Sequence, residues 1–107
     1  MSPATVSDRA FRAIADPTRR GVLDLLAEGE RPVNDLVRRF RMTQPALSQH
    51  LRVLRQAGLV AQRRVGRERL YRIRPKQLKL VADWVARYER FWQRKLRDLG
   101  DYLEKDK

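Results

Sequence analysis

The fold of this 107-residue chain is decided by one stretch, residues 32–59, which reads PVNDLVRRFRMTQPALSQHLRVLRQAGL. Its first part is a short amphipathic segment, with apolar residues at Val33, Leu36, Val37 and Phe40. A second segment begins at Thr43, which stands where a helix N-cap belongs, and Pro45 falls in the first turn, where a missing N–H costs little. Apolar residues then recur at helical spacing, at Leu47, Leu51 and Leu54, and Gly58 stands at a helix stop. Two helices joined by a tight turn form a helix-turn-helix, which we assign to residues 33–58.

The outer face of the second helix carries side chains that can bind DNA. Between Thr43 and Leu59 there is no acidic residue, whereas a solvated helix face normally includes acids. The residues away from the leucine stripe are Gln44, Ser48, Gln49, Arg52 and Arg55. Because such side chains hydrogen-bond base edges or phosphates, the pattern favours a DNA-reading helix over a plain helical hairpin. We assign base readout to Gln44, Ser48 and Gln49, and phosphate contacts to Arg52 and Arg55.

Positive charge is concentrated around this stretch. The chain carries 25 basic and 13 acidic residues, a net charge of +12. Residues 31–74 alone hold twelve arginines against Asp35 and Glu68, a net charge of +10, and every basic residue before Lys76 is Arg. Such a block attracts a polyanion, and Arg suits bidentate contacts to phosphate or guanine. A membrane-surface role would need a bulky apolar insertion face opposite the basic residues, which a helix-turn-helix does not offer.

What the sequence lacks excludes several classes of function. There is no Cys, which excludes disulfides and thiolate metal sites, and one His does not make a metal site. Ser48 and His50 point about 200° apart on a helix, so no nucleophile–base pair is available; neither an enzyme nor a cofactor is expected. No apolar run approaches the ~20 residues of a membrane span, and the N-terminus lacks a signal-peptide core. We therefore expect a soluble cytoplasmic protein, associated with the nucleoid.

The residues before the helix-turn-helix predict a loose tail at residues 1–4 and two short helices. The first begins at Thr5 or Ser7 and ends near Asp16; its apolar face holds Val6, Ala10, Phe11 and Ile14. The second helix has Asp16 as its N-cap and Pro17 at its first position.

Three further residues leave alternatives open. Arg19 and Arg20 stand in the first turn of the second helix, where cations oppose the helix dipole. An external anion or an internal carboxylate is therefore their expected partner. His50 lies at the edge of the leucine stripe, where it either caps the core or contacts a phosphate; we include it among the DNA-binding candidates.

After Gly58 the apolar period changes from helical to alternating. Residues 60–74 predict two strands joined by a tight turn at Gly66-Arg67, although Leu70 and Ile73 do not alternate strictly and leave the register uncertain. A two-stranded hairpin is marginal alone, so it must pack on the helices as a wing. The wing residues expected along the DNA backbone or in the minor groove are Arg63, Arg64, Arg67 and Arg69.

Pro75 breaks the strand, and residues 76–103 predict one long helix. One apolar stripe consists of Leu78, Val81, Val85, Tyr88, Trp92, Leu96, Leu99 and Leu103, and a second set of Leu80, Trp84 and Phe91. One stripe would suffice to dock the helix on its own domain, so two aromatic faces indicate that one is buried against a second subunit. In the alternative, the small domain wraps around the helix and buries both. The expected dimer contacts are Val6, Phe11, Trp84, Tyr88, Phe91, Trp92 and Leu99.

Two motifs carry a family resemblance: residues 15–20 followed by Val22-Leu23, and residues 44–54 followed by Ala57-Gly58-Leu59-Val60. With them the chain from Phe11 to Leu103 resembles the ArsR/SmtB family of winged-helix bacterial repressors. The resemblance implies a mainly α winged helix-turn-helix in the order α-α-α-α-β-β-α, and a homodimer paired through the first and last helices. It also implies that each subunit presents one recognition helix and one wing to double-stranded operator DNA.

The chain departs from the metal-sensing members of that family. Pro32-Val33-Asn34 stands where those members carry Cys-Val-Cys, and the last helix contains Asp83 but no His. The chain therefore resembles the metal-independent branch, which includes SdpR-like autorepressors. Control is then expected from the level of the protein itself, a partner protein or an organic ligand.

The function predicted is a sequence-specific repressor that binds an inverted-repeat operator, with repression of its own gene as one option. Two alternatives remain: a non-specific architectural DNA-binding protein, and an adaptor that binds proteins through the aromatic last helix. Comparing operator with random DNA affinity tests the first, and a mobility-shift assay tests the second.

Overall fold

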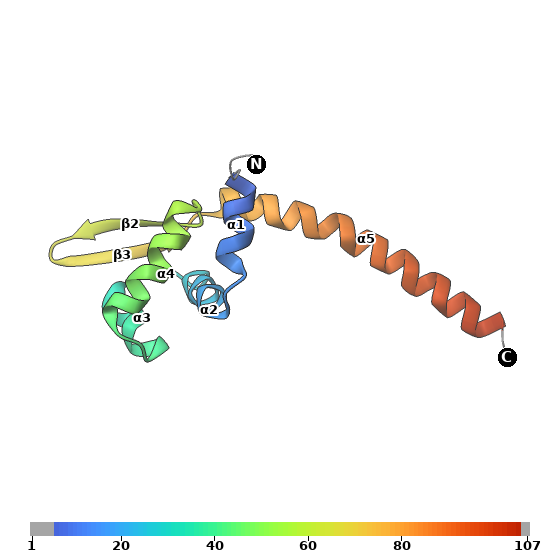
Figure 1. Cartoon of the computed structure of the whole chain (residues 1–107), viewed down its shortest axis with the longest axis horizontal. Helices are drawn as coiled ribbons and strands as arrows, with labels where there is room; N and C mark the ends of the chain where they lie inside the picture. Colours follow the sequence, from blue (N-terminus) through green and yellow to red (C-terminus); the bar gives the residue numbers. More distant parts are fainter. Residues whose placement is uncertain (1–5, 106–107) are drawn as a thin grey trace.

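The computed structural model describes the backbone of residues 6–105 and the side chains of residues 8–104. The tail expected at residues 1–4 and the side chain of Val6 lie outside the described residues. The elements, in chain order, are α1 (Val6–Ile14), α2 (Pro17–Leu26), β1 (Arg31–Pro32), α3 (Val33–Phe40), α4 (Gln44–Gln56), β2 (Val60–Val65), β3 (Glu68–Ile73) and α5 (Pro75–Lys105). Figure 1 shows α1 to α4 gathered at the base of the β2–β3 hairpin, while the hairpin and α5 project in opposite directions. The predicted mainly α winged helix-turn-helix is confirmed.

Side-chain caps define where α2 and α4 begin. The carboxylate of Asp16 accepts a hydrogen bond from the backbone N–H of Arg19 at 3.0 Å, and the hydroxyl of Thr43 accepts one from the backbone N–H of Ala46 at 3.3 Å. Each helix also has a proline in its first turn, where no intrahelical N–H bond is lost. Both N-caps are those that the sequence predicts.

The end of α4 is a Schellman motif built on Gly58, which has a φ of +74°. The backbone N–H of Leu59 donates to the carbonyl of Leu54 at 3.0 Å, and that of Gly58 to the carbonyl of Arg55 at 3.0 Å. A Cβ at position 58 would lie 3.0 Å from Cγ of Gln77 at the start of α5. Glycine therefore lets the chain turn from α4 into β2 beneath the beginning of α5.

The hydrophobic core lies among α1 to α4 and the base of the sheet. Its largest fully buried side chains are Leu26, Leu36, Leu47, Leu51, Leu54, Leu59, Val22 and Val60. From α5, by contrast, only Val81 is buried and Leu78 packs against the core from a half-buried position, among the residues that the structure describes. The leucine stripe of α4 is thus buried as predicted, and it fixes which face of α4 remains outside.

The sheet has three antiparallel strands in the order β1-β3-β2, one strand more than predicted. In β1, Arg31 pairs with Tyr71 and Pro32 with Leu70. A strand of two residues is too short to show an alternating pattern in the sequence. Proline is tolerated in it because β1 is an edge strand. The register, which the sequence left open, places Gln62 opposite Tyr71. Tyr71 is buried in the core, and Leu70, the preceding residue of the strand, points to the other face.

Helix α5 runs unbroken through Gly100 for 31 residues, a length of about 46 Å. It gives the chain extents of 67 × 35 × 20 Å, and in Figure 1 its distal part lies clear of every other element. Its exposed apolar residues are Leu80, Trp84, Val85, Tyr88, Phe91, Trp92, Leu96, Leu99, Tyr102 and Leu103. The alternative in which the domain wraps around this helix and buries both apolar faces is therefore wrong.

Candidate nucleic-acid interface

The outer face of α4 is open to a large partner along its whole length. Gln44, Ser48, Gln49, Arg52 and Arg55 are all exposed, whereas the three leucines of the opposite face are at most 1% exposed. Burial of the leucines fixes the rotation of the helix about its axis, and this rotation presents the five polar and basic side chains outward. The structure therefore brings these five predicted residues together on one surface.

The first turn of α4 adds a favourable electrostatic environment for anions. Residues 44–46 are exposed, and the positive end of the helix dipole lies there. Arg41, which the sequence reasoning passed over, lies three residues before Gln44 as the C-cap of α3, with a left-handed φ of 50°. It is exposed at the entrance to α4. A basic residue in the turn of a helix-turn-helix was the signal that could have identified it.

Several other arginines near α4 are held by acidic side chains. Asp35 at the start of α3 accepts from Arg31 at 2.9 Å, from Arg39 at 3.2 Å and from Arg38 at 3.3 Å. The hydrogen bond from Arg31 is the main reason that the pKa of Asp35 lies below its ordinary value. Arg31 also contacts Glu28 at 3.1 Å. This cluster attaches β1 to α3, so part of the positive charge in residues 31–74 is balanced within the fold.

The four wing arginines do not lie on one surface. Arg64 and Arg69 are directly opposite each other on β2 and β3, on the face of the hairpin that includes Tyr71. Like charges at such a position destabilise a sheet, and an anionic partner would relieve that repulsion. Arg67 is exposed in the turn between the strands.

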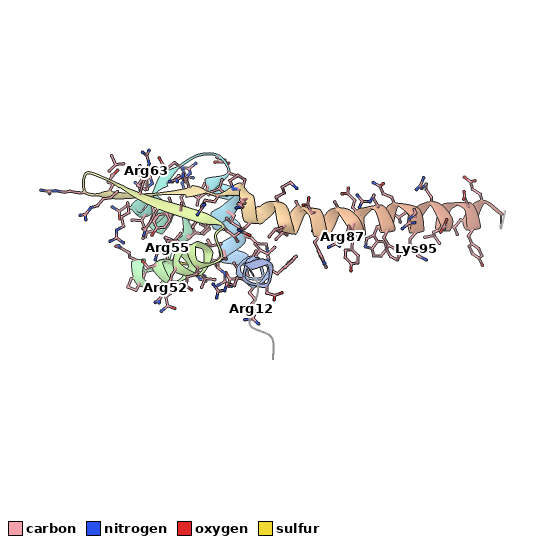
Figure 2. The ribbon with its side chains drawn as sticks, turned by 90° about the horizontal axis from the view of Figure 1, so that it is seen from above. Arg12, Arg52, Arg55, Arg63, Arg87 and Lys95 are labelled. Carbon is pink, nitrogen blue, oxygen red and sulfur yellow. The ribbon has the colours of Figure 1, made fainter. Side chains whose placement is uncertain are left out.

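Arg63 lies on the other face of the hairpin, where it makes a bidentate ion pair with Glu30. Its Nε and Nη2 donate to the two carboxylate oxygens at 2.9 and 2.7 Å. This hydrogen bond is the main cause that lowers the pKa of Glu30 from its ordinary value. Figure 2 shows Arg63 on the opposite side of the molecule from Arg52 and Arg55. The wing is thereby attached to the loop that precedes β1.

Arg19 and Arg20 have partners different from those predicted. Arg19 donates from Nε to the carbonyl of Ala13 at 2.6 Å, and Arg20 donates from Nη1 to the carbonyl of Ile14 at 2.8 Å. These carbonyls belong to the last turn of α1, where the partial negative charge of the helix dipole attracts cations. The prediction considered the dipole of their own helix and overlooked that of the helix before it.

His50 is half-buried beside the N-terminus of α2. Its Nδ1 lies 3.4 Å from Nη1 of Arg19 and 3.8 Å from Oδ2 of Asp16. Asp16 has a lowered pKa, chiefly because the backbone N–H of Arg19 donates to its carboxylate. His50 thus connects α4 to α2, a contact that neither interpretation from the sequence included.

The residues predicted for the dimer contact fall into two groups. Phe11 of α1 packs edge-on against Trp84 with ring centroids 5.2 Å apart, and Trp84 stacks at a tilt on Tyr88 at 4.7 Å. Further along α5, Phe91, Trp92 and Leu99 are 45%, 61% and 52% exposed. The first group joins α1 to α5, and the second continues its apolar surface beyond the body of the molecule.

Two features are absent from the part of the chain that the structure describes. There, no three His, Cys, Asp or Glu side chains come close enough together to hold a metal ion. Within the same residues, no helix combines the length and the apolar character needed to cross a bilayer.

Comparison with known proteins identifies relatives of this chain in sequence and in structure. A sequence profile described as bacterial regulatory protein, arsR family, matches residues 16–62. The chain is 37% identical over 106 residues to the HTH-type transcriptional regulator Rv2034 of Mycobacterium tuberculosis, covering 99% of this chain and 96% of that protein. It is 33% identical over 81 residues to the transcriptional repressor SdpR of Bacillus subtilis, covering 76% and 90% of the two chains. The crystal structure of an ArsR family transcriptional regulator superposes with a TM-score of 0.74 at 31% identity, covering 83% of this chain and 98% of that one.

Proposed function

Because the chain belongs to the ArsR family of DNA-binding transcriptional regulators, we propose that it is a sequence-specific repressor that binds an inverted-repeat operator as a homodimer. Membership of this family makes it a transcriptional regulator and not an enzyme. The observation that carries the finer proposal is the exposed, acid-free face of α4, which combines amide, hydroxyl and guanidinium groups.

Base readout is assigned to the N-terminal half of α4, at Gln44, Ser48 and Gln49. An amide side chain can bind adenine through two hydrogen bonds, and a hydroxyl can serve as donor or acceptor to several base edges. Recognition helices present their N-terminal residues to the major groove, and these three residues are exposed there. Each well-placed contact would contribute about 1–3 kcal/mol of discrimination against the wrong base.

Contacts to the DNA backbone are assigned to arginines on both sides of these residues. On α4 they are Arg52 and Arg55, with Arg41 at the preceding turn. On the wing they are Arg67 at the tip and the facing pair Arg64 and Arg69. Arg63, whose guanidinium already binds Glu30, is assigned the role of bracing the wing.

The dimer is assigned to α1 and α5. On one long helix Trp92, Leu96 and Leu99 are 61%, 60% and 52% exposed, and clustered exposed apolar residues of this kind mark protein–protein contacts. A second copy related by a two-fold axis would cover that surface with the same residues. It would also set two copies of α4 about 34 Å apart, as successive major grooves on one side of DNA require.

We propose further that the repressor does not sense transition metals. Zinc, nickel, cobalt and copper favour thiolate and imidazole ligands, and the chain has no Cys and a single His. Low-micromolar amounts of these metals, or of arsenite, should leave the protein–operator complex intact. Tag-free protein and titration into a preformed complex test this directly, and stoichiometric dissociation by any one of them would refute it.

Footprinting upstream of the chain's own gene locates the operator, and fluorescence anisotropy then compares it with a random duplex of equal length. Gln44→Ala should weaken operator binding by about 5- to 100-fold and random binding little, because a base contact is lost. Gln56→Ala, an exposed glutamine at the other end of the same helix, is the matched control and should leave the ratio unchanged.

The same assay separates the alternatives. Equal wild-type affinity for operator and random DNA would identify an architectural protein, and no binding to either would identify an adaptor. An unchanged operator-to-random ratio in Gln44→Ala would show that the base-reading assignment is wrong.

A further inference from the structure

The side chain of Arg19 connects three helices. From the first turn of α2, its Nε donates to the carbonyl of Ala13 at 2.6 Å and its Nη2 to the carbonyl of Arg12 at 3.1 Å. Its Nη1 lies 3.4 Å from Nδ1 of His50 on α4. One guanidinium thus touches both the end of α1 and the middle of the helix assigned to base readout.

The direction of this contact is fixed by the geometry of the guanidinium group. The group is planar with its donors in a rigid fork, so binding α1 through Nε and Nη2 also determines where Nη1 points. The backbone of the same residue is held as well, because its N–H donates to the Asp16 carboxylate at 3.0 Å. Arg19 therefore presents Nη1 to α4 from a position determined by α1 and α2.

His50 is suited to receive this contact. Arginine offers only donors, so a hydrogen bond from Nη1 requires the tautomer in which Nδ1 accepts; Oδ2 of Asp16 lies farther from the same nitrogen, at 3.8 Å. The buried leucines fix the rotation of α4 about its axis, and the contact at His50 fixes how far the part of the helix that carries Ser48 and Gln49 lies from α2. The ring of His50 is half-buried, so packing does not enclose it on every side.

We infer that Arg19 is a positioning residue for DNA recognition, which sets the position of α4 relative to α1 through Nδ1 of His50. Since α1 packs on α5 through Phe11 and Trp84, the contact ties the reading helix to the part of the chain assigned to the dimer. The inference rests on the proposed function, because it requires that α4 reads DNA.

The test compares Arg19→Ala with Arg20→Ala. Arg20 is a matched control, because it has the same charge and also donates to a C-terminal carbonyl of α1, at 2.8 Å, from a position that faces solvent. His50→Ala removes the acceptor, whereas His50→Asn keeps an amide oxygen near the place of Nδ1. Operator and random affinities, their salt dependence and the thermal unfolding midpoint are measured for each variant and for the double variant Arg19→Ala/His50→Ala.

Arg19→Ala and His50→Ala should each lower operator affinity about tenfold, with the double variant no worse than either, because coupled residues are not additive. Arg20→Ala and His50→Asn should stay within about threefold of wild type, since neither breaks the coupled contact. The salt dependence of Arg19→Ala should match that of wild type, because Arg19 is not assigned a phosphate contact.

Equal losses in Arg19→Ala and Arg20→Ala, additive losses in the double variant, or equal losses in His50→Asn and His50→Ala would each overturn the inference. So would a salt slope lowered by about one in Arg19→Ala, which would reveal a direct phosphate contact. If Arg19→Ala does not fold, the two His50 variants decide, since both leave the bonds to α1 intact. A wild-type protein without preference for the operator would instead defeat the proposed function, not the positioning role alone.

Discussion

The same apolar pattern is buried in the body of the molecule and exposed on α5. Leu54, on the stripe of α4, is fully buried, whereas Leu96, on the stripe of α5, is 60% exposed. Both stripes repeat at helical spacing, and both are made of large apolar residues. The difference shows that periodicity reveals that a helix has an apolar face without revealing what covers it. In the body the cover is the chain's own core; for α5 we propose that it is a second copy.

The largest effect is expected from a charge placed on the distal part of α5, where we propose that a second copy binds. Trp92→Glu should convert a dimer into a folded monomer, because Trp92 is 61% exposed and its ring contact is with Phe91 of the same helix. Operator affinity should fall by about 10²- to 10⁴-fold, as bivalent binding is lost. Light scattering with size-exclusion chromatography and anisotropy measure the two effects.

The control for Trp92→Glu is Gln93→Glu, which makes the same charge change at the next position, an exposed polar one. It should remain dimeric and bind DNA with a small loss. A Trp92→Glu protein that remained dimeric would refute the assignment of α5 to the subunit interface.

Truncating a leucine on each helix in a monomeric background compares how much each leucine contributes to the free energy of unfolding. In the Trp92→Glu chain, Leu54→Ala should lower the free energy of unfolding by about 2–5 kcal/mol, because it opens a cavity in the core. Leu96→Ala in the same background should change it by less than about 0.5 kcal/mol, as at an ordinary surface position. Urea unfolding followed by circular dichroism measures both, and equal losses would mean that α5 folds back onto the body.

A smaller difference is expected between the two faces of the wing. Arg63 is bound to Glu30 within the fold, whereas Arg64 faces Arg69. Arg64→Gln should reduce the slope of log affinity against log salt by about 0.9, because one phosphate contact is removed. Arg63→Gln should leave that slope unchanged and weaken binding only through a looser wing, as should Glu30→Gln. If Arg63→Gln reduced the slope as much as Arg64→Gln, the bracing role of Arg63 would be refuted.

The smallest expected effect is on stability in acid. The folded state lowers the pKa of Asp16, Glu30 and Asp35 from ordinary values of 3.8 for Asp and 4.5 for Glu. The unfolded chain therefore binds protons first as the pH falls, so the stabilisation is complete above the ordinary values and is lost as the pH drops through the lower folded ones. Thermal unfolding between pH 6 and pH 2 should show the midpoint falling below about pH 4.5. The fall should be shallower in Glu30→Gln, and an identical fall would contradict the ion pair with Arg63.

Much of the body could be predicted from the sequence because its signals are local. The N-caps Asp16 and Thr43, the stop at Gly58 and the buried leucines of α4 each depend on residues a few positions apart. The extra strand β1 escaped prediction, since two residues carry no period and one of them is proline.

The contacts that the sequence could not supply join residues distant in the chain. Glu30 meets Arg63 across 33 positions and Arg19 meets His50 across 31, so no spacing rule pairs them. These contacts determine which arginines are occupied inside the fold and which are left for an external anion. For the site, composition therefore pointed to α4 as the proposed reading helix, while the partners of the individual arginines required the structure.

Sedimentation equilibrium of the wild-type protein at low micromolar concentration tests the central claim most directly. If a second copy covers α5, the mass should be twice the 12.7 kDa of the chain, and it should fall to that of one chain in Trp92→Glu. A wild-type protein that sediments as a folded monomer at these concentrations would contradict the claim, because the apolar surface of α5 would then be stable in water without a partner.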